Sequence, residues 1–192
     1  MKWWIWVVLG LWIAVLVGIG CSPTADTNGN GDGPIDRKTP DGLLNWLAVA
    51  YAEKDLEAYE EALHDEFLFV FTKDSADTLG LDPEEPWWGK TKDVASSGNM
   101  FNSSEVTRIT MGYVPYGDRW QACEEVRDTT VYYGTCRRVI PDILVTIDKG
   151  AEPLNLVVQD SYLDVVVVRD PKFPDQVLYV FLKIQEVPQN PS

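Results

Sequence analysis

The chain is poor in the residues from which metal and catalytic sites are most often built. Its 192 residues include one histidine and three cysteines, and no CxxC pair occurs. A zinc site made from cysteine and histidine ligands needs three or four such residues, so this composition argues against one, and we expect no metal or other cofactor. Lysine and arginine are also scarce, at 16 against 30 aspartates and glutamates. A surface with this excess of negative charge repels phosphate backbones, so we expect no nucleic-acid partner.

Long apolar runs are absent except at the N-terminus, where residues 3–17 are almost entirely apolar. Lys2 precedes this run, and residues 18–21 (Gly-Ile-Gly-Cys) follow it. A positive first segment, an apolar helix and small residues before a cleavage point together form a secretory signal. We therefore expect the rest of the chain to be exported.

The end of this run resembles the lipobox of bacterial lipoproteins, where an aliphatic residue and two small residues precede a cysteine. Gly18 stands where leucine is usual, and Ile19 is larger than typical. The resemblance implies a signal peptide over 1–20 and attachment of fatty chains, such as palmitate, to Cys21. It places the protein on a membrane of the cell envelope, outside the cytoplasm. Because Ser22 and not aspartate follows Cys21, it favours the outer membrane in a two-membrane bacterium. An uncleaved transmembrane anchor is the alternative, since the run is nearly long enough to span a bilayer.

Residues 21–38 are rich in glycine, asparagine and aspartate, which indicates a flexible tether after the lipidated cysteine. Asp26 begins half of a calcium-loop pattern, but Arg37 occupies the twelfth position, where a bidentate acid is needed. A spacer is the better interpretation. We predict a single folded domain over 39–188, long enough to bury a core.

The folded part begins with helix signals and continues with strand signals. Thr39, Pro40 and Asp41 are typical of a helix start, and Asp55 can cap a second helix. A third helix is expected at about 90–101, after a loop that runs to 87–89. Short β-branched and aromatic runs predict strands at 67–71, 106–113, 142–147, 154–169 and 176–187. The last strand is apolar on both of its faces, so it needs cover on both: helices on one side, and cavity-lining side chains or a partner subunit on the other.

This order of elements resembles the nuclear transport factor 2-like superfamily, which includes polyketide cyclases and ketosteroid isomerases. The resemblance also rests on residues 51–59 (YAEKDLEAY), Leu63 and residues 67–69 (FLF). It implies an α+β fold in which a cone-like curved antiparallel sheet packs on two or three N-terminal helices, with a pocket at the open end. Residues 115–141 are longer than the usual link, which indicates an elaborated hairpin or an insertion. The fold alone assigns no function.

Cys123 and Cys136 remain once Cys21 carries lipid. In an exported protein they are a candidate disulfide, which would close a short loop and stabilise the fold by roughly 3 kcal/mol. Two unpaired thiols are the alternative.

Several residues are candidates for the pocket. Asp142, Asp160 and Asp164 lie in or beside apolar strands, where a buried carboxyl would have a raised pKa, although outward-facing positions are commoner for such residues. Trp88 and Trp120, together with Trp87, can stack on sugars or on a partner protein, although packing under a loop is the commoner fate. We place His64 at the end of the second helix, on the surface between acids.

Three functions fit these patterns. The first is a membrane-anchored, non-enzymatic module that binds a small apolar ligand or an envelope protein. The second is an isomerase or hydrolase that uses a buried aspartate in the cone. The third is a structural homodimer formed through the sheet. An enzyme predicts a cavity that holds an acid with a raised pKa and a polar neighbour, whereas a binding module predicts aromatic walls without that pair.

Overall fold

The computed structural model describes residues 35–150, 153–158 and 161–188. Cys21, Asp160, the expected signal peptide and most of the expected tether lie outside the described residues. The elements, in chain order, are α2 (Pro40–Glu53), α3 (Leu56–Glu61), β1 (Leu63–Val70), α4 (Lys73–Leu79), β2 (Trp87–Gly89), α5 (Lys90–Phe101), β3 (Val106–Arg127), β4 (Thr130–Ile147), β5 (Leu154–Val158), β6 (Ser161–Arg169) and β7 (Tyr179–Pro188).

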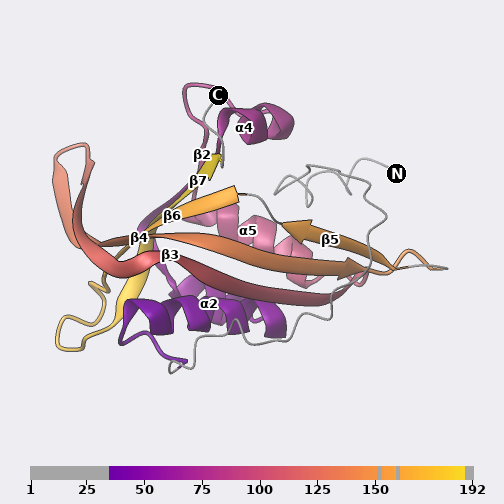
Figure 1. Ribbon diagram of the computed structural model, residues 1–192, viewed down its shortest axis with the longest axis horizontal. Helices are drawn as coiled ribbons and strands as arrows, with labels where there is room; N and C mark the ends of the chain where they lie inside the picture. The colour runs from indigo at the N-terminus through magenta and orange to yellow at the C-terminus, as the bar shows by residue number, and fades with distance from the viewer. Residues whose placement is uncertain (1–34, 151–152, 159–160, 189–192) are drawn as a thin grey trace.

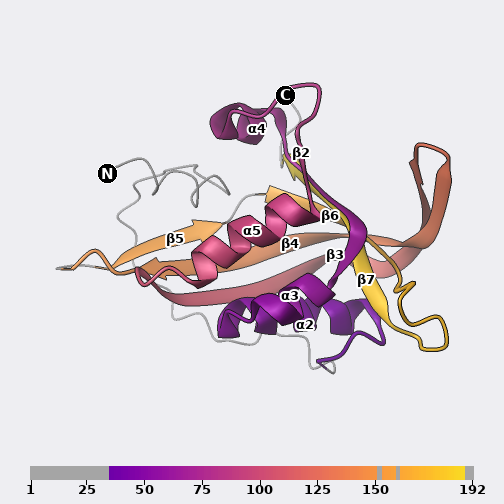
Figure 2. The same ribbon diagram turned by 180° about the vertical axis from the view of Figure 1, so that it is seen from behind.

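One curved sheet holds the seven described strands, in the order β2-β1-β7-β6-β4-β3, with β5 beside β4. Helices α2, α3 and α5 lie on the same side of this sheet (Figures 1 and 2). This arrangement confirms the expected α+β cone. The sheet is mixed and not wholly antiparallel, because β7 returns to lie parallel to β1 while also pairing antiparallel with β6.

The helix starts follow from local chemistry. Thr39 Oγ1 accepts a hydrogen bond from the Gly42 amide at 2.9 Å, and Asp55 Oδ1 accepts one from the Ala58 amide at 3.0 Å. Each bond satisfies a backbone donor that the first helical turn leaves free. Both predicted caps, and the predicted third helix over 90–101, are confirmed.

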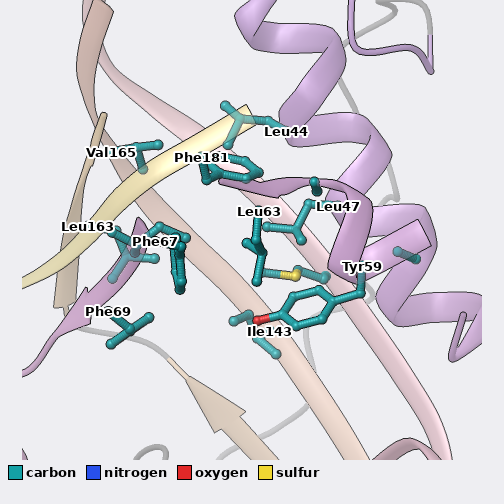
Figure 3. Close-up of a cluster of buried hydrophobic side chains, with 14 of the residues drawn as sticks. Leu44, Leu47, Tyr59, Leu63, Phe67, Phe69, Ile143, Leu163, Val165 and Phe181 are labelled. Carbon is teal, nitrogen blue, oxygen red and sulfur yellow. The ribbon is translucent and has the colours of Figure 1, made fainter. Parts of the chain in front are cut away.

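The main core lies between the helices and the inner face of the sheet. Figure 3 shows how Leu47 and Tyr59 from the helices meet Leu63, Phe67 and Phe181 from β1 and β7. Complete burial of a leucine or phenylalanine side chain contributes roughly 1.5–3 kcal/mol. The apolar helix face and the aromatic strand of the sequence pattern are therefore joined in one core.

The segment 115–141 is an elaborated hairpin, one of the two forms expected. It is the continuation of β3 and β4, and its turn lies at one end of the sheet (left in Figure 1). Tyr132 near this turn packs against Val168, Val180 and Leu182, which form a second small core. The second apolar face of the last strand is thus covered by the chain's own hairpin.

Two elements differ from expectation. Only a loop is expected between residues 71 and 87, yet α4 forms there, because Thr72 caps it and Gly80 ends it with a left-handed φ of 65°. Glu186 of β7 holds its start by accepting hydrogen bonds from Thr72 and Ser75. The strand expected over 154–169 is described as two, β5 and β6, and both pair with β4.

Candidate functional site

An apolar cavity of about 100 Å³ lies between the helices and the sheet. Its walls come from α2, α3, α5 and the inner faces of β1, β3, β4, β5, β6 and β7, and include Leu47, Phe69, Met100, Met111, Ile143 and Leu156. The lining also holds one carboxyl, Asp93, and three phenols, Tyr51, Tyr59 and Tyr113. Apolar walls with a few convergent polar groups are the usual composition of a small-molecule site.

Asp93 lies in the first turn of α5 and is 3% exposed. The Tyr59 hydroxyl donates a hydrogen bond to Asp93 Oδ2, and no described ion pair includes this carboxylate. Burial raises the pKa of Asp93 from 3.8 to about 6, and the hydrogen bond from Tyr59 offsets part of this rise. Near neutral pH the group is therefore poised to take up or release a proton.

The tyrosines around Asp93 are uncharged hydrogen-bonding groups. Burial, and then the charge of Asp93, raise the pKa of Tyr51 to about 12 and the pKa of Tyr59 well above its ordinary value. The Tyr51 hydroxyl lies 3.5 Å from Ser97 Oγ, and its ring meets that of Tyr59 edge-on with centroids 5.2 Å apart. Figure 3 shows the Tyr59 hydroxyl extending from α3 toward Ile143 of β4. Asp93 thus has one neutral hydrogen-bond donor, Tyr59 on α3, and a second neutral phenol, Tyr51 on α2, lies against Tyr59 and Ser97.

The aspartates singled out from the sequence lie elsewhere. Asp142 is exposed. Asp164 accepts two hydrogen bonds from Arg138, at 2.6 and 2.8 Å, as a half-exposed ion pair. Asp160 lies outside the described residues. Neither Asp142 nor Asp164 lines the cavity, whose carboxyl is Asp93.

The tryptophans also take structural positions. Trp88 is buried against Phe71, with ring centroids 4.9 Å apart. Trp120 packs at the edge of the core and donates from Nε1 to Asp41 at 2.9 Å. Neither residue lines the cavity.

The expectation of a surface histidine is wrong. His64 lies in β1 and not at a helix end, and it is 8% exposed. Its Nδ1 accepts a hydrogen bond from the Glu66 amide, and its ring meets the Tyr132 ring edge-on. Burial lowers the pKa of His64, so the ring is neutral near pH 7. The curled hairpin covers this position, which short-range sequence patterns do not reveal.

Cys123 and Cys136 are free thiols in this structure and lie on the paired strands β3 and β4. Their partners across the ladder are Gly134 and Gln121, so the cysteines are diagonal neighbours on the same face of the sheet. Burial, and then the neighbouring Cys136 side chain, raise the pKa of Cys123 above its ordinary value.

Asp93 is missing from the sequence-derived candidates, although a signal for it exists. In the expected helix over 90–101, Asp93, Ser97 and Met100 follow the i, i+4, i+7 spacing of one helix face. That face also carries Phe101 toward the core. An acidic residue on the core-facing side of an expected helix is the sequence signal that identifies Asp93 as a candidate.

Among the residues that the structure describes, no cluster of three histidine, cysteine or acidic side chains could hold a metal ion. Within the same residues, no helix has the length and hydropathy required to cross a bilayer.

No protein-family model and no curated protein matches the chain. Among solved structures, it is similar to a nuclear transport factor 2-like superfamily protein from Salmonella enterica serovar Typhimurium, with 6% identity, coverage of 78% of this chain and 88% of that one, and a TM-score of 0.47. ActVI-ORFA from Streptomyces coelicolor has 9% identity, coverage of 76% and 91%, and a TM-score of 0.45. A conserved protein from Planctomyces limnophilus has 12% identity, coverage of 76% and 91%, and a TM-score of 0.48. Likenesses at this level carry no information about activity.

Proposed function

We propose that this domain is an acid–base enzyme, in which Asp93 exchanges a proton with a small, mostly apolar molecule bound in the cone cavity. The observation that carries the proposal is a carboxyl buried in an apolar cavity, in contact with the Tyr59 hydroxyl and with no cation paired to it among the described residues. A cavity that holds an acid and a polar neighbour is the pattern expected of the enzyme and not of the simple binding module.

The chemistry follows from the ionisation of these groups. A carboxylate whose pKa is about 6 is a stronger base than an ordinary aspartate, yet it is still ionised in half or more of the molecules at neutral pH. The phenols remain protonated, so they can donate hydrogen bonds to a negative charge that develops on a bound oxygen. Removal of a proton from the carbon beside a carbonyl group, as in an isomerisation, needs a base such as Asp93 and a hydrogen-bond donor to the carbonyl oxygen such as a phenol.

The cavity volume limits the size of the substrate. Pockets for drug-sized ligands have volumes of about 300–1,000 Å³, whereas this cavity measures about 100 Å³. A molecule of a few heavy atoms fits most easily. A larger one requires the flexible side chains of Met100 and Met111 to move.

The test measures proton exchange on a simple probe. Full-length protein is incubated with cyclopentanone in D₂O, and the loss of α-proton signal is followed by NMR. We expect acceleration by the wild type and a reduction of that acceleration by about 100-fold or more in Asp93→Asn. Asp142→Asn, which changes an exposed carboxyl, is the matched control and should retain the wild-type rate. Equal rates for wild type and Asp93→Asn would remove the support for catalysis and leave the non-enzymatic binding of a small apolar ligand as the better function.

We propose further that the domain works at the cell envelope, held to a membrane by lipid on Cys21. The support is the N-terminal pattern of Lys2, the apolar run over 3–17 and the small residues before the cysteine. We also propose that the chain belongs to the nuclear transport factor 2-like superfamily, that it has an envelope-protein partner and that two copies can pair through the sheet.

A further inference from the structure

A second hollow, a surface groove of about 820 Å³, lies where the turn of the β3–β4 hairpin faces β1, β2 and the start of α5. We name it the Trp87 groove. Its lining includes Glu66, Trp87, Thr91, Lys92 and Asp128. None of its lining residues lines the cone cavity, so the two sites are separate.

The short strand β2 divides two adjacent tryptophans between the core and the groove. Successive side chains of a strand point to opposite faces, and Trp88 is 5% exposed whereas Trp87 is 41% exposed. Lys92 Nζ lies 4.9 Å from the centre of the Trp88 ring, so this lysine is held beside the groove. The Trp87 ring therefore offers an open aromatic surface, whereas Lys92 is held against the Trp88 ring, which also lines the groove.

The charges around the groove balance. Three cationic side chains (Lys90, Lys92 and Arg127) stand against three anionic ones (Asp65, Glu66 and Asp128). This balance, in a protein with a large negative excess, favours a ligand without net charge. Six of the twelve lining residues are charged, whereas the centre of a protein–protein interface is depleted of charged residues.

Two polar side chains of the groove have no hydrogen-bond or ion-pair partner among the described residues. Neither Thr91 nor Asp128 makes a side-chain hydrogen bond or ion pair there, whereas Lys90 already donates to the Leu63 carbonyl oxygen and to Asp65. A hydroxyl group and a carboxylate together supply one donor and several acceptors. They are free to bind a ligand that carries many hydroxyl groups.

We propose that the Trp87 groove binds a neutral oligosaccharide, with one sugar ring stacked on the Trp87 indole. A sugar ring presents an apolar C–H face and a rim of hydroxyl groups. The exposed indole matches the apolar face, and the side chains of Thr91, Lys92 and Asp128 match the hydroxyl groups. This binding is independent of the chemistry proposed for Asp93.

The test is calorimetric titration of full-length protein with three neutral probes: cellotetraose, maltotetraose and N-acetylchitotetraose. We expect at least one of them to bind. Trp87→Ala should weaken that binding by about tenfold or more, and Trp87→Tyr should restore most of it because an aromatic face is kept. Asp128→Asn should also weaken binding. Asp93→Asn should leave it unchanged, which separates the groove from the cavity.

Phe173→Ala is the matched control, because Phe173 is 40% exposed and lies in the loop between β6 and β7, outside the groove. It should bind the oligosaccharide as the wild type does. Far-UV circular dichroism and thermal melting should show that Trp87→Ala remains folded. The proposal is overturned if no neutral probe binds, if Trp87→Ala binds as tightly as the wild type, or if the groove binds an unstructured peptide in preference to every sugar.

Discussion

Burial of a carboxyl group costs free energy unless a cation or several donors compensate for the lost water. Asp93 has one described donor, the Tyr59 hydroxyl, and no described cation. Its side chain therefore weakens the folded state whenever it is ionised. A residue that reduces stability in this way and lines a cavity is retained most simply for a function.

The free-energy cost of burying the ionised Asp93 carboxylate predicts how the stability of the protein varies with pH. Below about pH 4 the group is protonated in both states and has no effect, because its pKa is 3.8 when exposed and about 6 when folded. Between pH 4 and pH 6 the Asp93 carboxyl ionises in the unfolded chain but stays largely protonated in the folded one. Asp93 therefore lowers the free energy of unfolding as the pH rises through this range. Above pH 6 the full cost, about 3 kcal/mol, is present. Urea unfolding should therefore show Asp93→Asn gaining stability relative to the wild type between pH 4 and pH 7. A difference that does not vary with pH would contradict this.

Gly134 allows β4 to approach β6 closely. A Cβ atom here would overlap the Val167 carbonyl oxygen and lie 2.9 Å from Val168 Cγ1. We expect Gly134→Ala to lower the free energy of unfolding by about 1–3 kcal/mol, because backbone atoms must move. Gly112→Ala is the control in the same ladder, since its Cβ would have nothing closer than the Asp142 carbonyl oxygen at 3.9 Å. Equal stability of the two variants in urea would show that the strands can separate without cost.

At the scale of elements, the β3–β4 hairpin covers an apolar face of β7 that would otherwise need a second sheet or a partner protein to cover it. It curls so that Tyr132 packs on Val180 and Leu182. A bulge makes this packing possible: Val166 pairs with Lys183 and Val167 with Phe181, so Leu182 is the extra residue of β7. Phe181 and Ile184, three residues apart, consequently both reach the main core.

The hairpin also carries the two cysteines, and we expect them to form a disulfide in an oxidising compartment because they are diagonal neighbours on paired strands. In vitro, oxidised glutathione should convert the two thiols to one disulfide and yield two molecules of reduced glutathione. The intact mass should fall by about 2 Da, and stability should rise by about 3 kcal/mol. The reaction should be slow at neutral pH, because the raised pKa of Cys123 leaves little thiolate. Cys136→Ser is the control, and complete alkylation of both thiols after this treatment would contradict the pairing.

The elements that could be predicted from the sequence are those fixed by local signals. Thr39 and Asp55 mark helix starts, and the apolar face of α2 faces the core. The parallel pairing of β1 with β7 could not be predicted, because it joins segments more than 100 residues apart. The helix α4 has local signals, since Thr72 caps it and Gly80 ends it, but it is only seven residues long, and Glu186, which also holds its start, is more than 100 residues away.

At the scale of the whole molecule, the candidate site depends on the cone. Asp93, Tyr59 and Tyr51 come from three helices, and they meet only because the curved sheet gathers these helices on one side. The sequence offers a buried aspartate only as what an enzyme would require, and its candidates for that role do not include Asp93. Asp142 and Asp164 lie in strands as expected, yet the twist and pairing of those strands place one in solvent and the other beside Arg138.

The N-terminal pattern predicts how the protein is held at a membrane. Cells that produce the protein and are given radiolabelled palmitate should incorporate the label, whereas Cys21→Ala should abolish incorporation and leave an unprocessed chain. Cys123→Ala, which keeps the N-terminal pattern, is the control and should be labelled normally. Processing of Cys21→Ala identical to that of the wild type, without label in either, would exclude the lipid anchor.

The most direct measurement is the titration of the Asp93 side chain, followed by ¹³C NMR of the aspartate carboxyl groups and assigned by comparison with Asp93→Asn. We expect one carboxyl resonance, absent from the variant, to titrate with a midpoint near pH 6. A midpoint near pH 4 would mean that water or a cation reaches Asp93, and would contradict a buried proton-exchanging group in the cone cavity.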